Sequence, residues 1–72
     1  MINTQLLDEK IHQSGLYLKF IIEKLGISRN GFDKKRKGIT PFRTAEIYVL
    51  SDLLNLSEED KSLIFFAPKV EE

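Results

Sequence analysis

The residues with the clearest chemical potential are basic, and they are concentrated in the middle of the chain. Residues 28–43 contain six lysines and arginines and a single acidic residue, Asp33. Ammonium and guanidinium groups at this density bind polyanions, and phosphate groups above all, because several charge-assisted hydrogen bonds form at once. A solvated helix face has a similar composition, so the flanking pattern has to decide between the two interpretations.

Charge is distributed unevenly along a chain whose formal net charge is zero. Residues 1–27 contain three basic and three acidic side chains, whereas residues 44–72 contain two basic and seven acidic ones. The net charges of the three segments are therefore 0, +5 and −5. A polyanion would be attracted to the middle segment rather than to the protein as a whole.

The sequence lacks the residue sets that other chemistries require. It has no cysteine, which excludes disulfides and thiolate metal sites, and its one histidine, His12, cannot form an imidazole site unaided. The carboxylates of residues 58–60 directly follow Ser57, a placement typical of the first turn of a helix rather than of a catalytic pair. No phosphate-binding glycine loop or nucleophile motif is present. We expect no enzyme activity, no metal, no cofactor and no small-molecule ligand.

Seventy-two residues suffice for one small domain. We expect a single domain over residues 1–72, with an ordered core over about 4–67 and a loose tail over 68–72. The N-terminus has no basic region followed by an apolar run, and the longest apolar runs fall far short of the ~20 residues that cross a membrane. These features predict a soluble cytoplasmic protein that makes no membrane contact.

Apolar spacing and capping residues predict five short helices and no strand, which places the chain in the all-α class. The first helix is expected to begin with Thr4 as its cap and to end at Ser14. The second is expected over 17–25, where apolar residues recur at i, i+3, i+4 and i+7. These apolar residues are Leu18, Ile21, Ile22 and Leu25.

The last two helices follow a loop over 39–42, which is expected to contribute Phe42 to the core. The fourth helix begins near Thr44 and ends near Asn55, whereas the fifth is capped by Ser57 and ended by Pro68. The expected buried face of the fourth comprises Ile47, Leu50, Leu53 and Leu54. The expected apolar side of the fifth comprises Leu63, Ile64 and one of Phe65 or Phe66.

The third helix is unusual because it has almost no apolar side. It is capped by Ser28, extends to Arg36 or Lys37, and is ended by Gly38. Phe32 is its only strong apolar anchor. A helix this polar cannot be held by its own burial, so the rest of the fold must present it, and it is expected to face a polar partner.

Residues 18–37 have the spacing of a helix-turn-helix, in which Gly26 lies where the chain reverses and where a side chain would clash. The segment IIEKLGISRNGF resembles the Cro and phage-repressor type of helix-turn-helix, the Xre-like group of bacterial and phage regulators. The segment EIYVLSDLLNLSEEDKSLIFFA resembles the last two helices of short members of that group. The resemblance covers about residues 4–67 and implies a lambda-repressor-like fold of five helices.

In that family the polar helix enters the major groove of DNA, and the resemblance implies which residues would contact it here. Arginine pairs with guanine and asparagine with adenine, while Asp33 either accepts from cytosine or orients Arg29 or Lys37, four residues away. The expected base-contacting residues are Ser28, Arg29, Asn30, Asp33, Lys34 and Lys37. The expected phosphate-contacting residues are Lys19, Lys35, Arg36, Lys37, Thr40 and Arg43.

Three positions differ from the family pattern. Ile22 replaces a small residue, Leu18 replaces a glutamine that contacts phosphate, and Lys35 replaces an apolar residue near the end of the polar helix. In addition, Gly31 lies inside that helix, where glycine costs ~1 kcal/mol relative to alanine. Gly31 is either a place where the backbone approaches DNA closely or a tolerated weak point.

The resemblance implies a sequence-specific, double-stranded DNA-binding transcriptional regulator that acts as a Cro-like repressor by occupying an operator. It also implies a symmetric homodimer that reads two half-sites ~34 Å apart, in which Phe66 either folds onto the core or meets the second subunit. A function of a different class stays open, namely a helical protein-interaction module that uses the acidic, apolar face of residues 44–72. An antitoxin-like role that uses both surfaces is also open.

Overall fold

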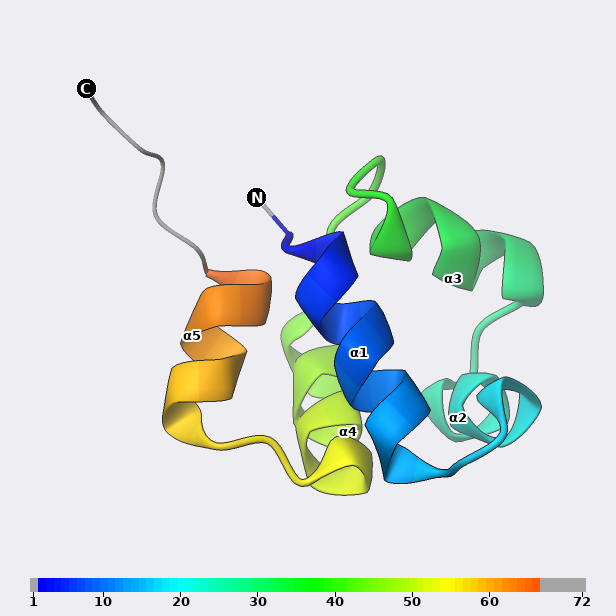
Figure 1. Ribbon diagram of the computed structural model, residues 1–72. Helices are drawn as coiled ribbons and strands as arrows, with labels where there is room; N and C mark the ends of the chain where they lie inside the picture. The colour runs from blue at the N-terminus through cyan, green and yellow to red at the C-terminus, as the bar shows by residue number, and fades with distance from the viewer. Residues whose placement is uncertain (1, 67–72) are drawn as a thin grey trace.

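A computed structural model describes residues 2–66, which form five α-helices and no strand (Figure 1). The helices are α1 (Thr4–Ser14), α2 (Leu18–Leu25), α3 (Arg29–Arg36), α4 (Thr44–Leu54) and α5 (Glu58–Phe65). The predicted all-α class is therefore confirmed for this part of the chain. The predicted tail over 68–72, which includes Pro68, lies outside the described residues.

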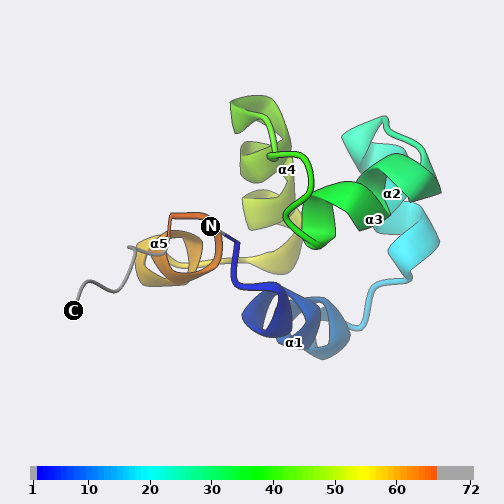
Figure 2. The same ribbon diagram turned by 90° about the horizontal axis from the view of Figure 1, so that it is seen from above.

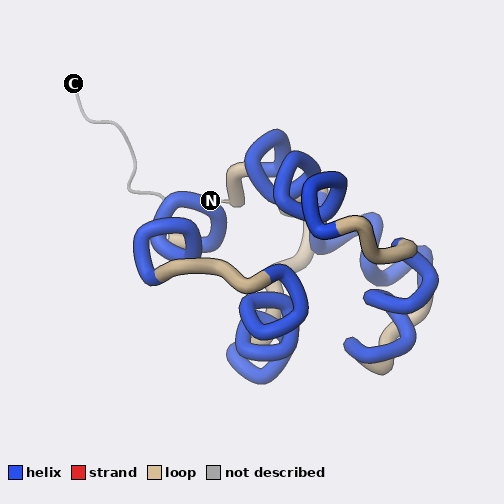
Figure 3. The backbone as a smooth tube through the Cα atoms, turned by 60° about the horizontal axis from the view of Figure 1, so that its bottom comes forward, coloured by secondary structure: helices blue, strands red, loops and turns tan. Residues whose placement is uncertain are grey.

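The helices are arranged along one long direction. Helix α5 lies at one end of the molecule and the α2–α3 pair at the other, with α1 and α4 between them (Figure 2). Helix α1 packs on α4 and α5, while α2 packs on α4 and α3. Short loops make most of the connections (Figure 3). The backbone amide of Asn3 donates to the carbonyl of Ile64 at 2.8 Å, which ties the start of α1 to α5.

Local capping residues define where α3 and α5 begin. The Ser28 hydroxyl accepts a hydrogen bond from the Gly31 amide at 2.9 Å, and the Ser57 hydroxyl accepts one from the Asp60 amide at 3.0 Å. The Asp60 carboxylate in turn accepts from the Ser57 amide, which completes a capping box. Both predicted caps are confirmed.

Helix α1 begins differently from the prediction. Its cap is Asn3, whose side-chain oxygen accepts a hydrogen bond from the Leu6 amide at 3.1 Å. Thr4 is not the cap, because it already lies inside the helix and its hydroxyl donates to the backbone carbonyl of Arg36 at the end of α3. The helix therefore starts one residue earlier than predicted, and the residue expected to cap it links it to α3 instead.

The turn between α2 and α3 needs glycine for a reason other than the one expected. Gly26 has φ +73°, a left-handed conformation that glycine adopts without steric cost. No atom of the surrounding fold lies within 4 Å of the place where a Cβ would stand, so the expected clash is wrong. The backbone conformation alone selects glycine, and it brings α3 back across α2.

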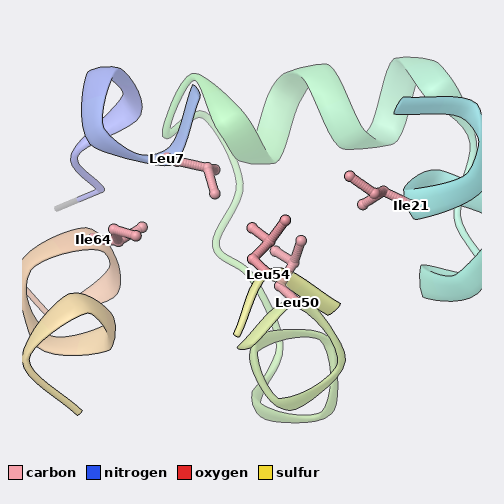
Figure 4. Packing of buried hydrophobic residues seen from close by; sticks show 5 residues of the cluster. All are labelled: Leu7, Ile21, Leu50, Leu54 and Ile64. Atoms are coloured by element: carbon pink, nitrogen blue, oxygen red, sulfur yellow. The ribbon is translucent and has the colours of Figure 1, made fainter. Parts of the chain in front are cut away.

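Five buried aliphatic side chains form the core (Figure 4). They are Leu7 from α1, Ile21 from α2, Leu50 and Leu54 from α4, and Ile64 from α5. Burial of such side chains stabilises a fold by roughly 1.5–3 kcal/mol each. Side chains from four helices therefore meet in the core, whereas α3 contributes no residue to this cluster and packs at its edge.

The predicted apolar face of α5 is partly wrong. Leu63 is 44% exposed, whereas Phe65 is half-buried and packs against the core cluster. Phe66 is 61% exposed, so Phe65 is the aromatic residue that folds inward. The predicted α4 face is confirmed for Leu50 and Leu54, while Ile47 and Leu53 are half-buried.

Candidate nucleic-acid interface

Helix α3 is held by few contacts, which fix both its middle and its end. Phe32 is fully buried, and its ring meets the edge of Phe42 with 6.3 Å between centroids. Phe42 in turn meets Phe65 with 5.6 Å between ring centroids, and half-buried Phe42 packs against the core cluster, as predicted. At the last turn, the Arg36 carbonyl accepts the hydrogen bond from Thr4. The fold thus presents a polar helix in a fixed position, as its composition predicts.

The outward side of α3 has a polar and basic stripe. Asn30, Lys34 and Lys37 recur at i, i+4 and i+7, and all three are exposed. Seen from above, α3 lies on the surface with no other helix over it (Figure 2). We call these three residues the outward stripe. Their amide and ammonium groups are free to meet a flat or grooved partner.

Arg29 and Asp33 lie on the flank of this stripe and face each other. The Nε atom of Arg29 is 3.6 Å from Oδ1 of Asp33, one helical turn further along. The side chain of Arg29 is 67% exposed and that of Asp33 is 35% exposed. Of the two roles that the sequence leaves open for Asp33, the geometry favours that of orienting Arg29.

Lys35 is directed into the fold rather than outward. Its Nζ lies 2.6 and 2.7 Å from the two carboxylate oxygens of Glu46 in the first turn of α4. Both side chains are nearly buried, with exposed fractions of 14% and 8%. The ammonium group that was expected to meet phosphate is therefore used within the protein, where it joins α3 to α4.

Glu46 was missed as a structural residue. Burial by itself raises the pKa of Glu46, but hydrogen bonds from Lys35 and from the Arg43 amide, together with two nearby positive charges, outweigh this effect. The net pKa lies below its usual value of 4.5, so the carboxylate is charged at neutral pH. Glu46 precedes Leu50 and Leu54 at intervals of four, so its place in the apolar stripe could have indicated a buried charge in need of a partner.

Arg36 also has a partner within the fold. Its Nη1 atom lies 2.8 Å from Oδ2 of Asp8 in α1. The Arg36 side chain is 26% exposed, and its guanidinium would have to share or leave this partner in order to contact phosphate. Arg36 and Lys35 thus differ from the outward stripe, although all of these residues belong to the same basic run.

The other expected contact residues are exposed. Lys19 lies in the first turn of α2, and Thr40 and Arg43 lie in the connection between α3 and α4. Ser28 is exposed as well, but its hydroxyl is occupied as the cap of α3. Gly31 faces that hydroxyl, since a Cβ on it would stand 3.1 Å from Ser28 Oγ.

A hollow of about 580 Å³ separates α3 from the second half of α1. Its lining includes the two charge pairs Arg29–Asp33 and Arg36–Asp8, and also Tyr17, the cap residue of α2. Tyr17 is 85% exposed and was not expected to lie beside α3. The one sequence feature that indicates this placement is that Tyr17 directly precedes the helix-turn-helix segment 18–37.

The opposite end of the molecule has a different character. Glu58 and Glu59 in the first turn of α5 are exposed, and Lys61 pairs with Glu58 at 2.7 Å. The acidic first turn of α5 and the basic helix α3 therefore lie at separate ends of the long direction (Figure 1). Among residues 2–66 no helix is long and apolar enough to cross a bilayer, and no three metal-binding side chains cluster.

Comparison of the chain with protein-family models, with curated proteins and with solved structures found no match. The function of this surface therefore has to be inferred from its geometry and its charge.

Proposed function

We propose that the chain is a sequence-specific, double-stranded DNA-binding transcriptional regulator in which α2 and α3 act as a helix-turn-helix. The observation that carries the proposal is the outward stripe of Asn30, Lys34 and Lys37 on a helix whose one buried side chain is Phe32. An α-helix with its side chains is about 10–12 Å wide, which matches the ~12 Å width of the major groove. Helix α3 is uncovered along its length and can enter that groove (Figure 2).

The exposed residues divide into two chemical roles. Asn30 is suited to adenine, because its amide offers a donor and an acceptor side by side, and Lys34 and Lys37 are suited to acceptors on bases or phosphates. Lys19, Thr40 and Arg43 flank the stripe on neighbouring segments and serve as phosphate contacts. Lys35 is left out of the surface because Glu46 holds it.

The proposed regulator is a Cro-like repressor that occupies its operator and blocks polymerase in the bacterial cytoplasm. We include a symmetric homodimer, because one copy with about four phosphate contacts would bind weakly at physiological salt. The 61% exposure of Phe66 is compatible with a second subunit at that end of α5. The resemblance of residues 21–32 to phage regulators supports the same assignment.

Fluorescence anisotropy with random-sequence duplex DNA, from low salt to 200 mM, tests the proposal. A dimer with about eight phosphate contacts should give a log–log slope near −7, at about −0.9 for each contact. Lys34→Ala and Lys37→Ala each remove one contact per subunit, so each should make the slope of the dimer shallower by about 1.8. Lys61→Ala, on α5, is the matched control and should leave the slope unchanged. Absence of binding at low salt would overturn the proposal.

A second candidate function is a protein-interaction module. Tyr48 and Phe66 are 67% and 61% exposed, and both line a hollow of about 250 Å³ between α4 and α5. Glu58 and Lys61, which pair with each other at 2.7 Å, also line this hollow, so its surface is charged as well as apolar. Tyr48→Ser should abolish partner binding under this second function, whereas it should leave DNA binding intact under the first.

A further inference from the structure

The edge of the Arg29 guanidinium that faces Asp33 determines which edge is left to recognise a ligand. The closest contact, at 3.6 Å from Oδ1 of Asp33, is made by Nε on the side of the guanidinium rather than by its two terminal nitrogens. Those terminal nitrogens form the edge that donates two parallel hydrogen bonds to O6 and N7 of guanine. We propose that Arg29 reads a guanine and that Asp33 is the positioning residue that aims its guanidinium. This inference rests on the proposed DNA-binding function.

Asp33 is the less exposed member of the pair. Its side chain is about half as exposed as that of Arg29, and it lines the hollow between α1 and α3 together with Tyr17 and Phe32. A long arginine side chain loses several rotatable bonds of freedom when it binds a base. The ion pair with Asp33 removes part of that freedom in advance, so Arg29 meets the groove already oriented.

The placement of Asp33 around the helix also directs Arg29 outward. At about 100° per residue, Asp33 lies ~40° from Arg29 on the side of the outward stripe. The pair therefore draws the guanidinium from the flank of α3 toward Asn30 and Lys37. Arg29 is the first residue of α3, and in helix-turn-helix proteins the start of this helix comes closest to the base edges.

The carboxylate has a second effect on binding. It places a negative charge beside the groove-facing surface, where it repels phosphates that approach in a wrong register. Removal of this charge should therefore strengthen binding to random DNA while it weakens discrimination between bases. A residue with only a structural role would not separate these two quantities.

The experiment begins with duplexes selected from a random library by the wild-type protein, followed by anisotropy on variants of the selected site. We expect one G·C pair per half-site at which Arg29→Ala lowers discrimination roughly 5- to 150-fold, the range of a bidentate contact. Asp33→Asn should lower discrimination at the same pair by at least ~3-fold, with equal or tighter binding to random DNA. Asp52→Asn is the matched control, since it removes an exposed carboxylate on α4.

A double variant tests the positioning role directly. In the Arg29→Ala background, Asp33→Asn should have no further effect at that base pair. If Asp33→Asn changes a different pair, or acts equally with and without Arg29, Asp33 contacts DNA by itself and the inference fails while the proposed function stands. Specific binding by the wild type with unchanged discrimination in Asp33→Asn also overturns it.

If the wild type binds no DNA, the proposed function and the inference fail together. Far-UV circular dichroism verifies that each variant is folded.

Discussion

Ser51 is buried in α4 without a hydrogen-bond partner for its hydroxyl among the described residues. An unpaired buried polar group costs roughly 1–3 kcal/mol, and serine is also a weaker helix former than alanine. Ser51→Ala should therefore raise the free energy of unfolding by about 1 kcal/mol, measured by urea denaturation. Ser62→Ala, at an exposed helical position, controls for helix propensity and should give only a few tenths of that gain. A destabilised Ser51→Ala variant would contradict the absence of a partner.

The Lys35–Glu46 pair makes stability depend on pH. Because the folded-state pKa of Glu46 is lowered, its contribution is complete above the usual value of 4.5 and is lost as the pH falls through the lower folded value. Glu46→Gln should cost about 1.5–3 kcal/mol at neutral pH, since it removes a charged hydrogen bond. The variant should also lose less stability than the wild type below pH 4.5, as measured by urea midpoints across the pH series.

Some acid sensitivity should survive in Glu46→Gln. The pKa of Asp60 is also lowered, chiefly by the hydrogen bond from the Ser57 amide and against a smaller opposing effect of desolvation. Its contribution is likewise lost on acidification. A Glu46→Gln variant with the same acid dependence as the wild type would show that Glu46 is not the group responsible.

At the scale of a single element, Ser28 and Gly31 should be energetically coupled in α3. Ser28→Ala should cost about 1 kcal/mol by removing the cap. Gly31→Ala should be near neutral in the wild type, because up to ~1 kcal/mol of helix propensity is offset by crowding of the cap hydroxyl at 3.1 Å. In the Ser28→Ala background, where no hydroxyl is crowded, Gly31→Ala should raise the free energy of unfolding by most of the ~1 kcal/mol of helix propensity. A thermal-denaturation double-mutant cycle measures this coupling, and additive effects would contradict it.

Helix boundaries were predictable where short-range chemistry decides them. The hydroxyls of Ser28 and Ser57 bond only three residues ahead, and Asn55 adopts its left-handed φ of 56° within its own turn. The start of α1 was shifted by one residue because Asn3 and Thr4 are both good caps. A bond from Thr4 to a carbonyl 32 residues away decides between them, and no local pattern contains that information.

The same distinction separates the predictable part of the candidate site from the rest. The outward stripe and the Arg29–Asp33 pair follow from helical periodicity, so the sequence contains them. Lys35 and Arg36 belong to the same basic run, but their partners lie 11 and 28 residues away in α4 and α1. Only the three-dimensional structure shows that these two side chains form ion pairs within the protein.

At the scale of the whole molecule, a domain this small depends heavily on single core residues. A stability of about 0.05–0.15 kcal/mol per residue amounts to roughly 4–11 kcal/mol for the chain. Leu50 is fully buried in the core, and Leu50→Ala should cost about 2–5 kcal/mol. Calorimetry should show a melting temperature lower by tens of degrees or no cooperative transition.

Leu63→Ala provides the contrast. This leucine is 44% exposed, so the loss should stay below about 1 kcal/mol. If Leu63→Ala lowered the free energy of unfolding as much as Leu50→Ala, Leu63 would be buried, as the sequence predicted for α5.

The hydrogen bond from the Asn3 amide to the Ile64 carbonyl has a consequence for motion. That amide can exchange its proton with solvent only when the start of α1 separates from the end of α5. Its exchange rate in D₂O, read by NMR, therefore reports the free energy of that single opening event. Exchange as slow as that of core amides in α4 would mean that all five helices open in one cooperative step. Faster exchange would identify the α1–α5 junction as a separate unit that opens while the α2–α3 surface stays folded.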